Sequence, residues 1–126
     1  MYYILVVDDS PVVRNYHMNI LKSVGFNVAG AGDGIEALEK ALANTYHLIL
    51  CDINMPNMDG LTFIRKYREL EKETPIIIIT TQEEVENKLM GYKSGANLYI
   101  TKPVQPQFLI THVQMLIGTM GSEELP

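Results

Sequence analysis

Short apolar runs alternate along the chain with longer stretches in which apolar residues recur at helical spacing. The runs are too short for helices and rich in β-branched residues, so they predict strands. Their continuous apolarity is typical of strands buried on both faces of a parallel sheet. The run at 75–80 is the most hydrophobic, so we expect it near the middle of the sheet. The predicted strands cover residues 3–7, 26–31, 47–51, 75–80 and 96–101.

The stretches between these runs predict five helices with recognisable ends. Ser10 is a candidate N-cap, Pro11 suits the first helical position, and Gly25 ends the first helix. Asp33 is a candidate N-cap of the second helix. Along the first helix, apolar side chains recur at helical spacing at Val12, Tyr16, Ile20, Leu21 and Val24. The predicted helices cover residues 11–24, 34–44, 61–72, 82–93 and 105–118.

Five strands that alternate with five helices predict an α/β fold, in which helices cover both faces of a parallel sheet. Right-handed crossovers between parallel strands leave few topologies. A chain of 126 residues is long enough for one core and too short for two. We therefore predict one domain over residues 1–118 and a short flexible tail at 119–126, which has no apolar periodicity.

The composition narrows the class of protein. An apolar share of 47% and a charged share of 20% are typical of a soluble globular domain. The net charge of −5 and the lack of a basic block argue against nucleic acid as a direct partner. The apolar runs are far too short to cross a membrane, and no basic stretch precedes the first run as in a signal peptide. We expect a cytoplasmic protein that contacts no membrane.

Three features that could indicate other chemistry are excluded by their context. A lone cysteine, Cys51, excludes an internal disulfide, and its place in an apolar run favours a core residue over a reactive thiol. The three histidines share no metal-ligand spacing. The glycine-rich stretch 30–34 resembles a dinucleotide fingerprint, but Ile35 stands where its third Gly or Ala belongs, so we interpret the stretch as a turn.

Polar side chains stand where the apolar strands end. Asp8 and Asp9 follow the first strand, and Asp52 ends the third. Thr80 ends the fourth strand, and Lys102 follows the fifth. The carboxyl ends of parallel strands share one edge of the sheet, where α/β proteins build their sites. We therefore expect these five side chains to converge on one cleft.

This set of side chains favours metal-assisted phosphoryl transfer. Three neighbouring carboxylates repel one another, and Mg²⁺ relieves that repulsion while keeping water for a phosphate to displace. Lys102 and Thr80 add an ammonium and a hydroxyl for phosphoryl oxygens. Asp52 is the best placed nucleophile and would form an acyl phosphate. Two plainer interpretations are a polar residue that only ends a strand and an acidic rim that binds adventitious cations.

With these residues in place, the sequence resembles the receiver domain of bacterial two-component response regulators, nearest to the stand-alone chemotaxis (CheY-like) type. The matching residues are Asp8-Asp9, the stretch DINMPNMDG that begins at Asp52, Thr80 and Lys102-Pro103, and the resemblance covers about residues 2–118. It implies a flavodoxin-like, doubly wound (βα)5 fold with strand order 2-1-3-4-5, the order of the chemotaxis regulator.

The resemblance also implies the metal ligands and the phosphoryl donor. Asp9 and Asp52 would bind Mg²⁺ directly, Asn54 through its backbone carbonyl, and Asp8 through water. Mn²⁺ is the alternative cation. Asp52 would accept the phosphoryl group of a phosphohistidine, carried by a sensor histidine kinase or a phosphotransfer protein, or that of acetyl phosphate.

A conformational switch is implied as well. Lys102 would bridge to the phosphoryl group, and its peptide bond to Pro103 would be cis. Thr80 would move to bind the new phosphoryl oxygen, and Tyr99 would turn inward, which would remodel the surface of the fourth helix, fifth strand and fifth helix. The alternative for Tyr99 is a half-buried aromatic residue on an edge strand.

Three functions follow from these residues. The first is a phosphorylation-driven signalling switch that turns over no foreign substrate and loses its own phosphoryl group slowly. An aspartate-nucleophile phosphatase is disfavoured, because Asn54 stands where its acid should be. An interaction module that has lost phosphorylation is disfavoured by the intact Asp52, Thr80 and Lys102.

The switch interpretation calls for protein partners. We expect a monomer that signals to a flagellar-motor component, a phosphorelay partner or a regulated enzyme, with a phosphatase as a further partner. The expected contact surface on the fourth and fifth helices includes Met90, Tyr92, Gln105 and Phe108, although Phe108 also suits the core.

Overall fold

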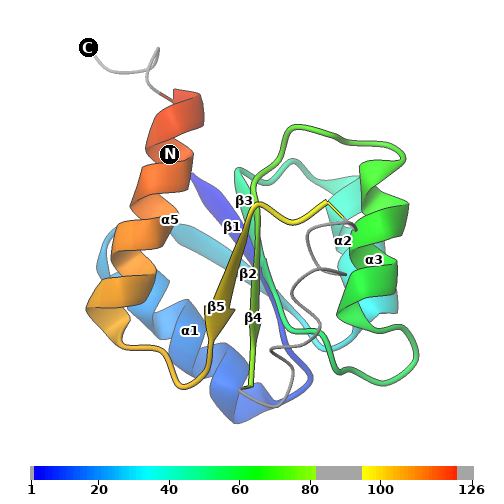
Figure 1. Cartoon of the computed structure of the whole chain (residues 1–126), viewed down its shortest axis with the longest axis horizontal. Helices are drawn as coiled ribbons and strands as arrows, with labels where there is room; N and C mark the ends of the chain where they lie inside the picture. The colour runs from blue at the N-terminus through cyan, green and yellow to red at the C-terminus, as the bar shows by residue number, and fades with distance from the viewer. Residues whose placement is uncertain (1, 82–94, 122–126) are drawn as a thin grey trace.

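Five parallel strands form the centre of the protein, in the order β2-β1-β3-β4-β5. The structure is a computed structural model that describes residues 2–81 and 95–121 (Figure 1). All four neighbouring strand pairs are parallel, so the predicted α/β sheet and the strand order are confirmed. The strands are β1 (Tyr3–Val7), β2 (Asn27–Ala31), β3 (Leu48–Cys51), β4 (Ile76–Thr80) and β5 (Leu98–Thr101).

Helices cover both faces of the sheet, as predicted. In Figure 1, α1 and α5 lie on one face and α2 and α3 on the other. The predicted helix at 82–93 lies outside the described residues. The described helices are α1 (Pro11–Ser23), α2 (Gly34–Ala43), α3 (Gly60–Arg68) and α5 (Pro106–Gly121).

The helix starts follow the predicted capping chemistry. The Ser10 hydroxyl accepts a hydrogen bond from the Val13 amide at 3.2 Å, with Pro11 at the first helical position. The Asp33 carboxylate accepts one from the Glu36 amide at 2.8 Å. These side chains satisfy amide groups that have no partner within the helix, which is why polar residues directly before a helical pattern are reliable signals.

Two helix ends differ from the prediction. The third helix ends at Arg68 rather than near residue 72, because the chain tightens there into a turn in which the Leu70 and Glu71 amides both donate to the Tyr67 carbonyl. At the carboxyl end, α5 continues past residue 118 to Gly121. The loss of apolar periodicity therefore did not mark the end of the helix, because helical backbone hydrogen bonds do not depend on the pattern of apolar side chains.

The face of α1 that packs on the sheet also differs from the predicted one. Ile20 and Leu21 are buried, but Val12 is 79% exposed and Tyr16 and Val24 are exposed as well. The buried face instead contains His17, which is only 2% exposed. Helical spacing shows which residues share a stripe, but the orientation of the helix on the sheet decides which stripe is covered.

The core lies on both faces of the central strands. Every residue of β3 and β4 is buried, and β4 lies inside the sheet between β3 and β5, as its apolarity predicted. Cys51 is fully buried, and burial raises the pKa of its thiol well above the usual value, so its prediction as a core residue is confirmed. Within the described residues, no helix is long and apolar enough to cross a membrane.

Candidate functional site

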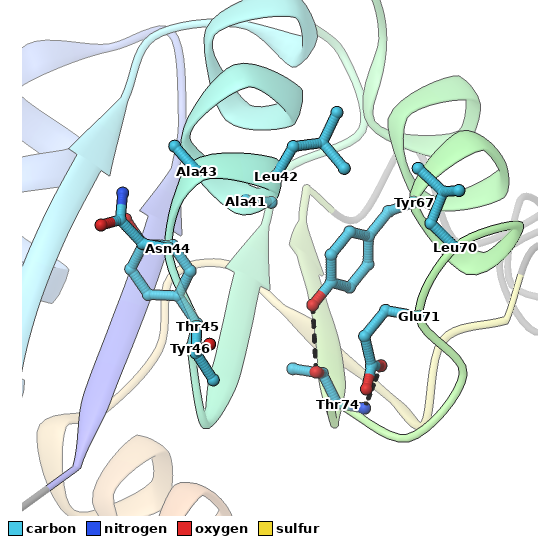
Figure 2. Close-up of a pocket in the computed structure, with 10 residues that line it drawn as sticks. All are labelled: Ala41, Leu42, Ala43, Asn44, Thr45, Tyr46, Tyr67, Leu70, Glu71 and Thr74. Atoms are coloured by element: carbon cyan, nitrogen blue, oxygen red, sulfur yellow. Dashed lines mark hydrogen bonds between the residues drawn. The ribbon is translucent and has the colours of Figure 1, made fainter.

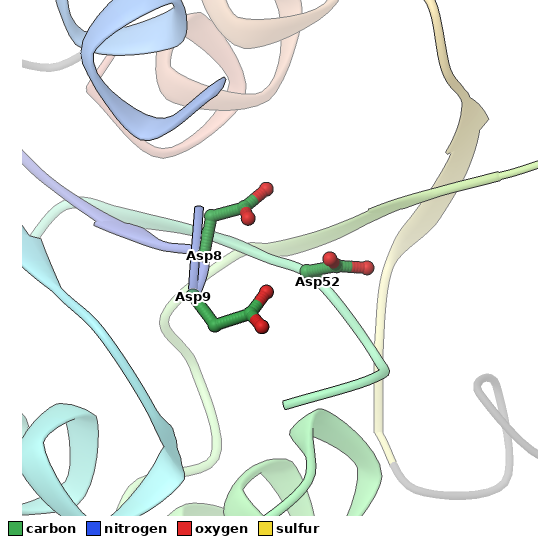
Figure 3. Close-up of side chains that lie close together, drawn as sticks. All are labelled: Asp8, Asp9 and Asp52. Atoms are coloured by element: carbon green, nitrogen blue, oxygen red, sulfur yellow. The ribbon is translucent and has the colours of Figure 1, made fainter. Parts of the chain in front are cut away.

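Three carboxylates meet at the carboxyl ends of β1 and β3. Asp8 and Asp9 follow β1, and Asp52 follows β3, the neighbouring strand. Oxygen atoms of all three side chains lie within 4.8 Å of one another, and Figure 3 shows the three carboxylates grouped at this edge of the sheet. The amide of Asp52 donates to the Val7 carbonyl at 2.9 Å, which continues the pairing of the two strands into the site. The predicted convergence of these acids is therefore confirmed.

Lys102 reaches this cluster from β5. Its ammonium nitrogen lies 2.8 Å from Asp8 Oδ2 and 3.1 Å from Asp52 Oδ2. The peptide bond between Lys102 and Pro103 is cis, as the resemblance implied. One cation thus bridges two of the three acids, and the acid it does not bridge, Asp9, is exposed to solvent.

Burial makes the charge on Asp52 unfavourable. Asp52 is only 8% exposed. This desolvation and the nearby Asp8 carboxylate raise the pKa of Asp52 above its usual value, although Lys102 acts in the opposite direction. Burial also disfavours the ammonium form of Lys102, but its hydrogen bonds and charge interactions with Asp8 and Asp52 outweigh this and raise the pKa of Lys102. Lys102 therefore stays positively charged beside Asp8 and Asp52.

The donors of this cluster fit a hard divalent cation. All three are carboxylate oxygens, which Mg²⁺ prefers, and the exposed Asp9 leaves room for water ligands. Two acids that share one lysine, with a third beside them, leave an excess of negative charge that a cation would neutralise. Asn54, the fourth predicted ligand, lies two residues beyond Asp52 on an exposed part of the loop.

A glycine closes the loop that carries Asp52. The Gly60 amide donates to the Ile53 carbonyl at 2.8 Å, and the Asp59 carboxylate caps α3 by accepting from the Thr62 amide at 2.8 Å. A Cβ atom at Gly60 would lie 1.9 Å from the backbone oxygen of Asp52. Only glycine allows the two backbones to approach this closely, so the Asp59-Gly60 pair shapes the site.

The two predicted switch residues are both buried. Thr80 is 1% exposed at the end of β4, on the edge of the sheet where the acids lie. Tyr99, on β5, is 9% exposed and belongs to the core cluster on the face covered by α2 and α3. Tyr99 therefore points inward in this structure, and it lies on β5, an edge strand of the sheet, where it is more fully buried than the half-buried aromatic of the alternative.

Two residues near the site were not singled out from the sequence. The Arg14 guanidinium, from α1, donates to the backbone carbonyl of Asp8 at 2.7 Å. His17, also on α1, is buried, and its burial together with the positive charge of Lys102 lowers the pKa of His17 to about 4. Neither residue belongs to a motif, and only the packing of α1 against the sheet brings them to the site.

A hollow of about 420 Å³ lies at the opposite end of the sheet, between the ends of α2 and α3 (Figure 2). Tyr67 projects into it and donates from its hydroxyl to Thr74 Oγ1 at 3.0 Å. The Glu71 carboxylate accepts hydrogen bonds from the Thr74 amide at 2.6 Å and the Glu73 amide at 2.7 Å. The side chains of Tyr67 and Glu71 that line this hollow are thus already hydrogen-bonded within the chain.

Comparisons with known proteins agree with this geometry. The family model of the response regulator receiver domain matches residues 4–114. The transcriptional regulatory protein SrrA of Staphylococcus aureus is 40% identical over 114 residues, which are 90% of this chain and 47% of that protein. The chain therefore spans about half the length of the curated relatives it matches.

Solved structures give the same result. A CheY-like response regulator receiver domain protein from Methanospirillum hungatei superposes with a TM-score of 0.92 at 29% identity, over 98% of both chains. The chemotaxis protein CheY4 of Vibrio cholerae superposes with a TM-score of 0.87 at 36% identity, over 92% of this chain and 98% of that one.

Proposed function

Because this chain belongs to the response regulator receiver domain family, we propose that it is a phosphorylation-driven signalling switch whose phosphoacceptor is Asp52. The observation that carries the proposal is the arrangement of charges around this residue. Asp52 shares Lys102 with Asp8, and Asp9 completes an acidic cluster that fits Mg²⁺. A nucleophile, a counter-charge and a cation site at one place are what phosphoryl transfer needs.

The chain's own residues suggest how the transfer would proceed. A carboxylate oxygen of Asp52 attacks the phosphorus atom in line, and the bond from phosphorus to the donor's imidazole nitrogen breaks, with its electron pair going to the nitrogen. Lys102, already 3.1 Å from Asp52, pairs with a phosphoryl oxygen as charge develops on it. Asp9, Asp52 and the Asn54 carbonyl would hold Mg²⁺ or Mn²⁺ directly and Asp8 through water, and the cation would neutralise further negative charge.

The switch would use the two buried residues of β4 and β5. We place the Thr80 hydroxyl as the donor that binds a phosphoryl oxygen, and Tyr99 as the ring whose position follows that movement. Their neighbouring strands are hydrogen-bonded, with Thr80 paired to Thr101, so a shift at the end of β4 acts directly on β5. The protein would turn over no foreign substrate and would lose its own phosphoryl group slowly.

The partners are proposed from chemistry and from similarity. A sensor histidine kinase or a phosphotransfer protein would donate the phosphoryl group, and a protein target would read the surface of β5 and α5. Phe108 is 49% exposed on that surface, so the core alternative for this residue is wrong, because its face of α5 points away from the sheet. Met90 and Tyr92 lie outside the described residues.

The names of similar proteins support two signalling pathways for this protein. The chemotaxis name of one similar structure supports a chemotaxis pathway, while the name of SrrA supports transcriptional control. We propose a cytoplasmic monomer in chemotaxis or a related phosphorelay. A flagellar-motor component is the first candidate target, another effector is the second, and a phosphatase is a further partner.

Acetyl phosphate tests the phosphoacceptor directly. Wild-type protein incubated with acetyl phosphate and Mg²⁺ is expected to gain one phosphoryl mass in intact-protein mass spectrometry. Asp52→Asn is expected to gain none, because an amide does not attack phosphorus as a carboxylate does. Asp59→Asn is the matched control, since it changes a nearby aspartate that caps α3.

Labelling of Asp52→Asn at the wild-type level would refute the assignment. Loss of labelling in the control variant alone would point to Asp59 instead. Circular dichroism of each variant shows that a missing phosphoryl group reflects chemistry and not unfolding.

A further inference from the structure

Arg14 crosses from α1 to the loop that carries the first two acids. Its Nη1 atom donates to the backbone carbonyl of Asp8 at 2.7 Å, a distance typical of a strong charge-assisted bond. This carbonyl belongs to the peptide group that joins Asp8 to Asp9. The orientation of that peptide group therefore influences the direction in which both side chains leave the backbone.

The glycine-rich stretch 30–34 provides the space for this side chain. A Cβ atom at Gly30 would lie 3.1 Å from Arg14 Cδ and 3.3 Å from its Nε, and one at Gly32 would lie 3.6 Å from Nη1. Among the described residues, the glycines with positive φ are Gly25 and Gly95, so Gly30 and Gly32 are not needed for an unusual backbone. At Gly30 a Cβ atom would crowd Arg14 and also Met18, whose Sδ atom would lie 3.1 Å away, whereas at Gly32 it would make only ordinary van der Waals contact, so it is Gly30 that leaves room for Arg14.

Side chains of α2 hydrogen-bond to the backbone of this glycine-rich stretch. Glu36 Oε1 accepts a hydrogen bond from the Gly32 amide at 2.7 Å. The Lys40 ammonium donates to the Gly30 carbonyl and pairs with Glu36 at 3.2 Å. Hydrogen bonds from α2 thus hold the backbone at Gly30 and Gly32. A side chain added at Gly30 would therefore displace Arg14 rather than the strand.

The other contacts of the acidic loop show what Arg14 adds. The Asp8 carboxylate is already held by the Ser10 amide at 3.0 Å and by Lys102 at 2.8 Å. Asp9 is exposed, and its carboxylate still lies in the cluster, so the backbone that carries it has to direct it there. The Asp8–Asp9 peptide group is therefore the element of this loop whose orientation determines where Asp9 points.

We propose that Arg14, seated over Gly30 and Gly32, is a positioning residue that holds the Asp8–Asp9 peptide group so that Asp9 faces Asp52 across the cation site. This inference rests on the proposed function of that site and concerns residues outside it. The partners that position metal ligands commonly contribute about 10- to 100-fold to metal affinity.

The sign of the effect separates positioning from simple charge. Arg14 is positive, so removing its charge alone would reduce repulsion and strengthen the binding of a divalent cation. If Arg14 positions Asp9, replacing it weakens cation binding instead. A residue that only stabilises the fold would change the melting temperature and leave the cation affinity of the folded protein unaltered.

The test compares Mg²⁺ affinity by isothermal titration calorimetry in wild type, Arg14→Met, Arg14→Lys and Gly30→Ala. We expect Arg14→Met to weaken binding roughly 10-fold. Arg14→Lys keeps one donor and is expected to recover part of the affinity, and Gly30→Ala, which keeps the arginine but crowds it, to weaken binding. The amide resonance of Asp9 in ¹H–¹⁵N spectra is expected to move in the variants that bind weakly.

Arg65→Met is the matched control, because Arg65 is an exposed arginine of α3 with only a 3.4 Å contact to Thr62. Unchanged or tighter Mg²⁺ binding by Arg14→Met would overturn the inference, as would an equal loss in the control. If Arg14→Met does not fold, Arg14→Lys and Gly30→Ala decide, and wild-type affinity in both overturns the inference. Failure of wild type to bind Mg²⁺ would instead refute the proposed function on which the inference rests.

Discussion

The two edges of the sheet hold acidic residues in opposite electrostatic situations. At the carboxyl edge, burial and the neighbouring Asp8 raise the pKa of Asp52 (Figure 3). At the amino edge, beside the hollow in Figure 2, burial acts on Glu71 in the same direction, but hydrogen bonds from Thr74 and Glu73 lower the pKa of Glu71. The charged form of a carboxylate is thus disfavoured at one edge and favoured at the other.

The difference lies in the donors. Glu71 accepts hydrogen bonds from two backbone N–H groups and lies 3.6 Å from Arg68, so groups of the chain stabilise its charge. Asp52 accepts one backbone N–H, from Ile53 at 2.7 Å, and divides Lys102 with Asp8. A carboxylate that the chain satisfies stabilises the fold, whereas one that the chain leaves short of positive charge favours binding a cation. The presence of a hollow alone does not identify the functional edge.

The largest expected effect on stability comes from a substitution in the loop that carries Asp52. Gly60→Ala would place a methyl group 1.9 Å from the Asp52 carbonyl oxygen. Because this oxygen belongs to the backbone, no side-chain rotation relieves the contact. We expect the free energy of unfolding in urea to fall by about 3 kcal/mol or more, with loss of phosphorylation by acetyl phosphate.

Gly118→Ala is the control for this substitution. A Cβ at Gly118, on α5, meets no atom within 4 Å, so alanine is expected to stabilise the helix by up to about 1 kcal/mol. Wild-type stability in Gly60→Ala would show that the loop relaxes easily and that the close approach does not shape the site.

A smaller effect would sharpen the contrast between the edges. Asp9→Ala removes one of three carboxylates from the cluster and is expected to weaken Mg²⁺ binding by about 10- to 100-fold, measured by calorimetry. Glu71→Ala removes an acid of the same charge from the other edge and is expected to leave the affinity within about twofold of wild type, because exposed charges at a distance are screened. Equal losses would mean that the metal responds to net charge and not to this cluster.

The smallest expected effect is on stability as a function of pH. Because the pKa of Asp52 is raised above the usual 3.8, its ionised form is disfavoured by folding, and this penalty is present at neutral pH and disappears as the pH falls below 3.8. Asp52→Asn is therefore expected to raise the melting temperature at pH 7 and to leave it unchanged at pH 3.

Glu71 is expected to show the opposite sign. Because its pKa is lowered from 4.5, its contribution to stability is present above that pH and is lost as the pH falls through the lower value of the folded state. Glu71→Gln is expected to lower the melting temperature slightly at pH 7 and to match wild type in acid. Melting curves by circular dichroism at both pH values give both comparisons, and the same sign for the two variants would contradict the contrast between the edges.

The comparison also shows why the sequence was informative at one edge and silent at the other. Asp8, Asp9, Asp52 and Lys102 each directly follow or end an apolar strand, so the geometry of a parallel sheet is enough to bring them together. Glu71 follows a helix that ends earlier than its pattern predicted, and its donors come from a turn. No periodicity marks such a turn.

The sequence by itself determined the strands, the capped helix starts, the edge on which the acids meet, and the burial of Cys51. Each depends on interactions within a few residues or on rules that hold for any parallel sheet, so a local pattern contains the information. The tertiary structure alone decided that α1 buries His17 instead of Val12, that Tyr99 is enclosed, and that Arg14 crosses the glycines of β2 to reach the Asp8 carbonyl. Those contacts join segments whose relative orientation is set by packing of the whole core, which no short stretch of sequence encodes.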